Sequence, residues 1–148
     1  MVPVFTVDSS CMVAAICAWH EHHVAAAAEI ERRLDRGEQL AVSAPALVES
    51  YAVLTRLPAP HRLAPADAWT LLEANFVEHR RIIVLTGAAY VATVRALAKQ
   101  GVGGGRTYDA VIAECAREAK PATLLTFNRR HFDPPPEGVS VVEPSASD

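Results

Sequence analysis

Residues 2–19 read VPVFTVDSSCMVAAICAW, two apolar runs separated by one acid and two serines. The run at 2–7 predicts a short buried strand, and the run at 9–19 predicts a buried helix that begins directly after Asp8. An ionised carboxylate between two segments that both require burial is costly unless it has a partner. The stretch therefore predicts a first strand–helix unit with Asp8 at its junction, either as a helix N-cap or as part of a site.

The same alternation continues along the rest of the chain. Further apolar strands are expected at 39–43, 81–85, 122–127 and 139–142, and helices at 22–36, 45–57, about 65–78, 87–100 and 107–120. Short apolar strands that alternate with longer helices are typical of a parallel sheet covered by helices on both faces. The predicted fold is a three-layer α/β/α sandwich. We expect one domain over residues 1–143 and a flexible C-terminal tail over 144–148.

Composition narrows the class of protein. The chain has 148 residues, 51% of them hydrophobic, which suits one domain with a real core. The net charge of −3 excludes nucleic-acid binding through bulk positive charge, so any such contact must be local. Cys11, Cys17 and Cys115 lie in apolar segments and read as reduced core residues. No Lys or Arg precedes Arg32, and the apolar run 11–19 is too short to span a bilayer, so a cytoplasmic protein is expected.

Four oxygen-bearing side chains lie after predicted strands or at the start of predicted helices. Asp8 comes directly after the first strand, and Glu49 lies early in the helix after the second. Asp109 opens the helix that follows the glycine loop 101–106, and Asn128 comes straight after strand 122–127. In an open parallel sheet, ligands bind beyond the carboxyl ends of the strands. We therefore expect these four side chains to converge on one edge of the sheet.

Each of the four has a simpler explanation when taken alone. Asp8 could be an N-cap, Asp109 could favour a helix start through the macrodipole, and Asn128 could be a turn residue. Glu49 could be a partly exposed helix residue. These explanations do not account for the placement of all four at one predicted edge.

Three carboxylates in one cleft would repel one another unless a positive group lay among them. An all-oxygen donor set suits Mg²⁺ or Mn²⁺, whereas Zn²⁺ would call for His or Cys. Such a cation can activate water and offset charge on a phosphoryl oxygen. The donor set therefore points to phosphodiester hydrolysis.

The motifs VDSS, PALVES, GGRTYDAVIAECA and LLTFNRRHF occur in the order and spacing of the PIN-domain ribonucleases. The chain resembles the VapC-type toxins of toxin–antitoxin pairs, from about residue 4 to residue 142. The resemblance implies an Mg²⁺- or Mn²⁺-dependent endoribonuclease whose metal ion activates water. It also implies a homodimer and a cognate VapB-type antitoxin that inserts a segment into the active-site groove.

Carried over to this sequence, the resemblance assigns the metal ligands to Asp8, Glu49 and Asp109. The family's fourth acidic position falls on Asn128, which completes the expected catalytic set. Its amide oxygen carries no charge, so the number of metal ions, one or two, stays open. Asp133 lies before three prolines and is not expected to compensate.

The resemblance also gives roles to neighbouring polar residues. Ser9 and Thr126 are expected to hydrogen-bond the acids or their waters. Arg106, Arg129 and Arg130 are placed to meet RNA phosphates, although solvated surface positions explain them equally well.

Other kinds of site or domain explain these residues less well. His20 and His23 could share a helix face, but no third ligand lies near them in the sequence. The loop GVGGGR lacks the preceding strand and the lysine of a phosphate-binding loop. A phosphorylation-receiver domain would need an acid at the end of a central strand and a Lys-Pro pair after a strand, and the pair at 120–121 precedes one. The alternative that stays open is a PIN-like RNA-binding or scaffold domain with weak or no catalysis.

Overall fold

The computed structural model describes residues 2–120 and 122–147. Its centre is a five-stranded sheet in the order β3-β2-β1-β4-β5, in which every neighbouring pair is parallel. The strands are β1 (Val4–Val7), β2 (Gln39–Ser43), β3 (Arg81–Ile83), β4 (Ala122–Leu125) and β5 (Val139–Val142). The helices are α1 (Ser9–Ile16), α2 (His23–Asp35), α3 (Ala44–Arg56), α4 (Pro65–Leu72), α5 (Gly87–Gln100) and α6 (Arg106–Glu118). The π-helical turn η1 (Glu73–Val77) continues α4, and the 3₁₀ turn η2 (Arg129–Phe132) follows β4.

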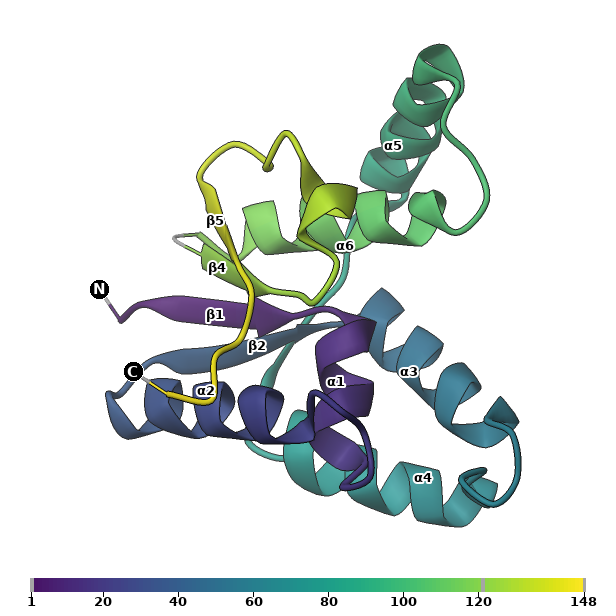
Figure 1. Cartoon of the computed structure of the whole chain (residues 1–148). Coiled ribbons are helices and arrows are strands. Elements are labelled where there is room, and N and C mark those ends of the chain that lie inside the picture. The colour runs from purple at the N-terminus through teal and green to yellow at the C-terminus, as the bar shows by residue number, and fades with distance from the viewer. Residues whose placement is uncertain (1, 121, 148) are drawn as a thin grey trace.

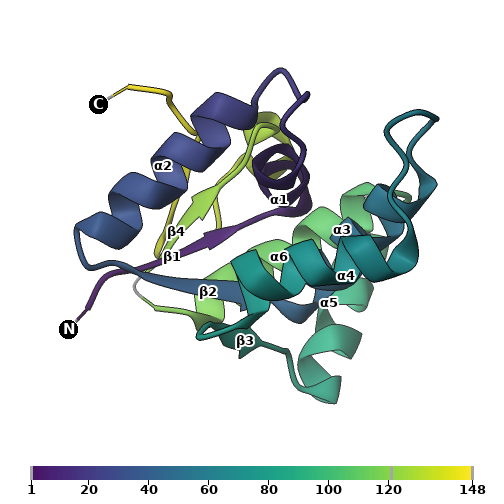
Figure 2. The same ribbon diagram turned by 90° about the horizontal axis from the view of Figure 1, so that it is seen from below.

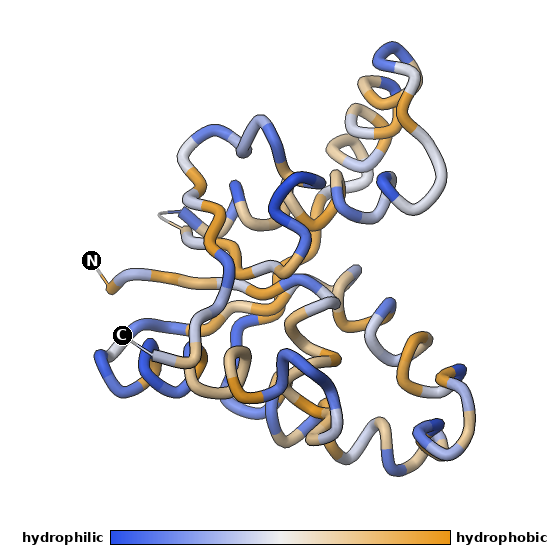
Figure 3. The backbone as a smooth tube through the Cα atoms, viewed as in Figure 1, coloured by the Kyte–Doolittle hydropathy of each residue, from blue (hydrophilic) through white to orange (hydrophobic). Residues whose placement is uncertain are grey.

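Helices cover both faces of this sheet, as the sequence predicts. α5 and α6 lie on one side of β1 and β2, and α1, α2 and α4 lie on the other (Figure 1). Successive side chains of a strand point to opposite faces, so β1 contributes side chains to two hydrophobic clusters, one on each face of the sheet. Phe5 and Val7 pack in a large cluster with Met12, whereas Val4 packs in a smaller one with Cys115 of α6. The apolar stretches of the chain gather on the central strands (Figure 3).

The strand order reverses at β1. Val4 pairs with Gln39 of β2 on one side, and Val7 pairs with Leu125 of β4 on the other. The outer strand β3 lies beyond β2, at the edge of the sheet (Figure 2). The crevice of an open parallel sheet opens where the strand order reverses. In this chain that point lies beyond the carboxyl ends of β1 and β4.

Several boundaries differ from the sequence-based expectation. The helix predicted over 9–19 ends at Ile16, and the one predicted over about 65–78 divides into α4 and η1. β3 and β4 each end two residues early, at Ile83 and Leu125. η2 was not predicted, because its four residues carry no apolar period. Apolar composition marks the middle of an element more reliably than its ends.

Among the residues that the structure describes, no helix combines the length and the apolar character that crossing a membrane requires.

Candidate functional site

Asp8 lies at the point where the strand order reverses. Its backbone N–H donates to the Leu125 carbonyl at 3.1 Å, which ties the start of α1 to the end of β4. Its carboxylate is 2% exposed and caps α1, accepting the Cys11 N–H at 3.0 Å. Asp8 is therefore the N-cap of α1, as one of the two explanations predicts. The cap accounts for only one of the hydrogen bonds that this carboxylate accepts.

Two hydroxyls donate to the same carboxylate. Ser10 reaches Oδ1 at 2.6 Å, and Thr126 reaches Oδ2 at 2.5 Å. Thr126 is fully buried, and its Oγ1 accepts the Asn128 N–H at 2.9 Å. Ser10 Oγ accepts the Phe127 N–H at 3.2 Å. The hydroxyls thus join Asp8 to the chain that leaves β4, and they hold both carboxylate oxygens in place.

Glu49 comes to this edge on α3. Ser43 at the end of β2 caps the helix by accepting the Ala46 N–H at 3.2 Å, and Pro45 lies in its first turn. Glu49 Oε1 accepts a hydrogen bond of 2.5 Å from Ser9, the residue after Asp8. The two adjacent serines of the VDSS segment therefore serve two acids, Ser9 bonding Glu49 and Ser10 bonding Asp8.

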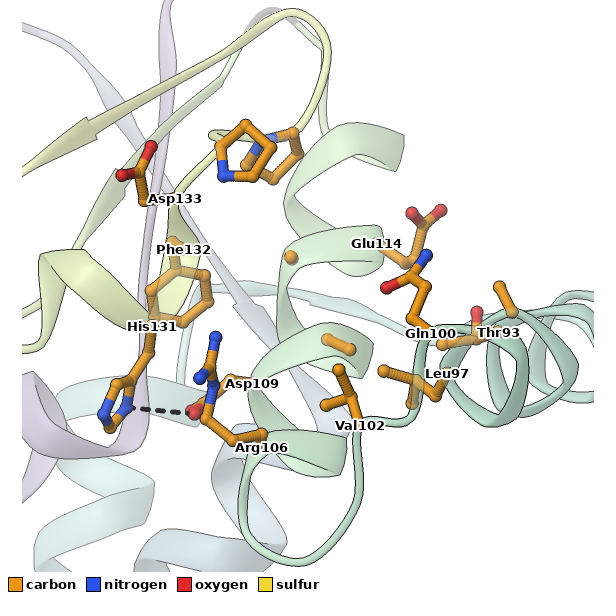
Figure 4. Close-up of a pocket in the computed structure, with 15 residues that line it drawn as sticks. Thr93, Leu97, Gln100, Val102, Arg106, Asp109, Glu114, His131, Phe132 and Asp133 are labelled. Atoms are coloured by element: carbon orange, nitrogen blue, oxygen red, sulfur yellow. Dashed lines mark ion pairs between the residues drawn. The ribbon is translucent and has the colours of Figure 1, made fainter.

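Asp109 lies in the first turn of α6 and pairs with a histidine. Its Oδ2 is 3.1 Å from Nδ1 of His131 in η2, and the two side chains face one another (Figure 4). They line a cavity of about 300 Å³ between α5, α6 and the segment after η2, together with Arg106. Asp133 also lines this cavity, but its carboxylate points away from Asp109 (Figure 4).

Burial and mutual repulsion act on these acids. Burial raises the pKa of Asp8 despite the hydrogen bonds from Ser10, Thr126 and Cys11, and the Asp109 charge raises it further. Burial also raises the pKa of Asp109. The His131 and Arg106 side chains lower the pKa of Asp109, whereas the Glu49 charge raises it. Asp109 therefore interacts electrostatically with both other acids, as expected of three carboxylates that share one region.

The other expected site residues lie around this centre. Arg106 lines the cavity beside Asp109, whereas Arg129 and Arg130, the first residues of η2, line a separate hollow bordered by β5. Asn128 is exposed and lines a separate cavity with Ser9 and Ser10. The fold thus links Asp8 and Glu49 through the adjacent serines Ser10 and Ser9. Asn128 lines the cavity on which the same two serines lie.

Sequence reasoning missed two polar residues of the site. Ser10 bonds Asp8 and the backbone after β4, and His131 pairs with Asp109. The VDSS segment holds a signal for Ser10, since it offers two hydroxyls beside the acid. For His131 the spacing from the end of β4 gives no comparable signal. Its approach to Asp109 depends on the turn η2.

The donor chemistry of the three acids fits a hard divalent cation, because every group offered is a carboxylate oxygen. In the described part of the chain, no three His, Cys, Asp or Glu side chains are arranged to hold a metal ion. Ser9 on Glu49 and His131 on Asp109 occupy carboxylate oxygens instead. The donor set therefore fits such a cation in its chemistry, while hydroxyl and imidazole groups contact oxygens of Glu49 and Asp109 in this structure.

Comparisons with known proteins bear on this arrangement. A family model described as PIN domain matches residues 5–135. Ribonuclease VapC40 of Mycobacterium tuberculosis is 41% identical over 123 residues, which are 83% of this chain and 85% of that protein. Ribonuclease VapC27 of the same species is 36% identical over 133 residues, 90% of each chain.

A solved structure gives the same fold. VapBC2 from Rickettsia felis, bound to a DNA fragment from the promoter of the pair, superposes with a TM-score of 0.66 at 20% identity. The match covers 96% of this chain and 99% of that chain. The three-layer arrangement around a parallel sheet is therefore confirmed.

Proposed function

This chain belongs to the PIN-domain family, and from that premise we propose that it is an endoribonuclease that hydrolyses RNA phosphodiester bonds with Mg²⁺ or Mn²⁺ as cofactor. The observation that carries the proposal is that the adjacent Ser9 and Ser10 hydrogen-bond Glu49 and Asp8 where the strand order reverses. In addition, the Asp109 charge raises the pKa of Asp8, and the Glu49 charge raises the pKa of Asp109. The names of the two ribonuclease relatives support the same activity.

Asp8, Glu49 and Asp109 are the residues that would hold the cation. When bound, it lowers the pKa of a coordinated water and offsets charge that develops on the phosphoryl oxygens. The protein's part is to orient the acids: Ser10 and Thr126 fix Asp8, Ser9 fixes Glu49, and His131 faces Asp109. Such supporting partners typically change metal affinity or activity by about 10- to 100-fold when they are removed.

Asn128 and the arginines have proposed roles around the acids. The Asn128 amide is a neutral oxygen donor that would hold a water or the substrate beside the site. Arg106 on one side, and Arg129 and Arg130 on the other, would bind RNA phosphates through their guanidinium groups. Because the chain as a whole is acidic, these local contacts would supply the attraction for RNA.

We further propose that the protein is the toxin of a type II toxin–antitoxin pair and is inhibited by a VapB-type antitoxin. The VapC relatives and the VapBC2 complex support this assignment. A cytoplasmic location is proposed with it. The buried free thiols Cys11, Cys17 and Cys115 agree with a reducing compartment.

A homodimer is proposed from the apolar side chains exposed on neighbouring elements. α3 exposes Val48, α5 exposes Val91 and Val94, and α6 exposes Tyr108. A mostly apolar groove of about 370 Å³ lies between α3 and Tyr108. Exposed apolar patches of this kind are typical of subunit interfaces.

The proposed nuclease domain covers residues 1–143, with a flexible tail over 144–148. The family model spans most of the proposed domain. In the tail, the Ser145 N–H donates to Glu29 of α2 at 3.1 Å. Limited proteolysis would test how readily this contact opens.

The proposal is tested with total cellular RNA and purified protein. We expect fragments in the presence of Mg²⁺ or Mn²⁺, none with a chelator, and none from Asp8→Ala. Mapping the fragment ends identifies the RNA and the cut site. Metal binding without cleavage by the unaltered protein would favour the inactive scaffold instead.

A further inference from the structure

A run of five aromatic rings crosses the surface next to the acids. The rings of His61 and Trp19 stack at 4.0 Å between centroids, and those of His22 and Phe127 stack at 4.4 Å and 12°. His20 lies between the two pairs, 5.7 Å from Trp19 and 5.7 Å from His22. We call these residues the aromatic run. It extends from the segment between α3 and α4 to the end of β4.

The Phe127 end of the aromatic run lines a cavity of about 380 Å³. His20, His22 and Phe127 form part of its wall, and Ser9, Ser10 and Asn128 form another part. Ser9 donates to Glu49, and Ser10 donates to Asp8. One serine side chain therefore separates this cavity from each of two acids in the proposed active site.

The aromatic run remains accessible from outside at both ends. The His22 side chain is 45% exposed, although one of its faces packs on Phe127. At the other end of the run, Trp19 is 48% exposed. Rings that served only to fill the core would be covered, as Phe5 and Phe76 are. Aromatic surface is thus left open beside the acids.

The His20 imidazole in the cavity wall is expected to be neutral rather than positively charged. Its Nδ1 accepts the His22 N–H at 3.0 Å, so the ring proton of the neutral form lies on Nε2. Burial lowers the pKa of His20, and the neighbouring His22 lowers it further. A neutral imidazole attracts a phosphate weakly, but its ring face suits the face of another flat ring.

We propose that this cavity binds one nucleobase of the RNA substrate, next to the phosphodiester that is cut, stacked against the His22–Phe127 pair. Unpaired bases that stack on aromatic side chains are a common mode of single-stranded RNA recognition. The inference rests on the proposed ribonuclease function and adds a base-binding subsite to it.

The charges around the cavity agree with a nucleotide as the occupant. Arg129 and Arg130 follow Asn128 directly and line a separate hollow, where they would meet a phosphate of the strand that leaves the cavity. Glu21 also lines the cavity, so its wall carries a carboxylate that disfavours a phosphate inside it. The base would therefore enter the cavity while its phosphates stay at the arginines and the acids.

The test measures binding of a short single-stranded oligoadenylate to the full chain in a chelator, so that the RNA is not cut. The base is deleted at one position of the RNA at a time. At one position we expect affinity to fall about tenfold, since stacking of one base contributes about 1–3 kcal/mol. In His22→Leu the intact RNA should bind about tenfold more weakly, and deletion of that base should have no further effect.

Two further variants separate stacking from other causes. His22→Phe keeps a ring and should bind RNA like the unaltered protein. Trp69→Leu removes an exposed ring from α4, outside the aromatic run, and should leave the base-deletion effect intact. Thermal melting of each variant checks that the fold is retained.

Clear outcomes would overturn the inference. It is wrong if the base-deletion effect persists in His22→Leu, or if His22→Phe binds as weakly as His22→Leu. It is also wrong if these variants weaken only the binding of a purified protein antitoxin, because the cavity would then be a protein-docking site. Failure of the ribonuclease proposal is distinguishable, since it would appear as RNA binding without cleavage after metal ions are added.

Discussion

Asp8 combines a structural and a proposed catalytic task in one side chain. As an N-cap, Asp8 stabilises α1. Its burial removes water from around the carboxylate, which makes the charged form less stable. The hydroxyls of Ser10 and Thr126 offset part of that cost. Carboxylates buried in such surroundings are typical of functional sites, where stability is often given up for activity.

Replacing Asp8 with Asn should make the metal-free protein more stable at neutral pH. Because the folded chain raises the pKa of Asp8, it takes up a proton at a pH where the unfolded chain stays ionised. That stabilisation is fully present below the ordinary pKa and is lost as the pH rises through the folded value. Asp8→Asn has no carboxylate to ionise, so its stability does not fall in this way as the pH rises. Its melting temperature should therefore exceed that of the unaltered protein at neutral pH, and the two melting temperatures should converge in acid.

Thermal melts in a chelator across this pH range measure the effect. A melting temperature of Asp8→Asn below that of the unaltered protein at neutral pH would contradict the assignment. RNA cleavage by this variant should fall to background, because one of the proposed metal ligands is lost.

Replacing Thr126 with Val should destabilise the fold. The buried hydroxyl donates to Asp8 and accepts the Asn128 N–H, so both partners lose a hydrogen bond. Hydrogen bonds to charged groups contribute about 1.5–3 kcal/mol, and we expect the free energy of unfolding to fall by that amount. The pKa of Asp8 should rise further. Urea unfolding measures the first effect.

Thr70→Val in α4 is the matched control for this change. Its exposed hydroxyl donates to the Ala66 carbonyl of the same helix, so the substitution should be nearly neutral. Equal stability of the Thr126 and Thr70 variants would show that the buried hydroxyl contributes little.

At the scale of elements, helix starts and short turns place the acids. β2 ends in Ser43, which caps α3 and so sets where Glu49 lies. α6 starts at Arg106 after the glycine loop, which places Asp109 in its first turn. The turn η2 brings His131 back to Asp109. The site thus depends on where elements begin and end.

Gly101 sets where α5 ends, and its contribution to stability can be tested by substitution. Gly101 terminates the helix with a φ of +71°, in the left-handed region that side chains disfavour. Gly101→Ala should therefore lower the free energy of unfolding by about 1–2 kcal/mol. Gly87→Ala, at the start of the same helix, is the control, since it should be neutral or stabilise by up to about 1 kcal/mol.

An added Cβ would meet no atom within 4 Å at either glycine, so the comparison isolates backbone conformation. Chemical denaturation of both variants gives the two values. If Gly101→Ala proves as stable as Gly87→Ala, the left-handed end of α5 is not a constraint in solution.

At the scale of the molecule, the proposed site is assembled from distant parts of the chain. Asp8 follows β1, Glu49 lies on α3, and Asp109 lies on α6. A ligand that joined them would link segments that separate on unfolding. Binding to the folded state alone stabilises a protein by mass action.

Mg²⁺ or Mn²⁺ should therefore raise the melting temperature. At a free concentration 100-fold above its dissociation constant, the gain is about 2.7 kcal/mol. Because the pKa values of Asp8 and Asp109 are raised, these ligands take up protons at a higher pH than ordinary aspartates. The gain should shrink as the pH falls toward those values, and it should be absent in Asp8→Asn. A pH-independent gain that survives in Asp8→Asn would place the cation elsewhere.

The proposed dimer is tested on its apolar surface. Val94→Lys adds a charge to the exposed apolar side of α5 and should convert the dimer into a monomer in light scattering. Val24→Lys on α2 is the matched control, since it alters an exposed valine away from that surface. A dimer that survives Val94→Lys would contradict this choice of interface.

The sequence by itself determined the alternation of strands and helices and the three-layer fold. It could do so because apolar period and chain breakers are local properties of neighbouring residues. It also placed Asp8 and Asn128 directly after predicted strands and Asp109 at a predicted helix start, since element ends can be approximated from the same pattern. The ends of α1 and α4 were missed, because tertiary contacts decide where a helix stops.

Only the tertiary structure decided which side chains meet. The approach of His131 to Asp109, the pairing of Ser10 with both Asp8 and Phe127, and the aromatic run each join residues from different elements. Their distances follow from strand order and from the path of the turn after β4, which no local pattern encodes. Burial likewise raises the pKa values of Asp8 and Asp109 only because the folded chain surrounds them.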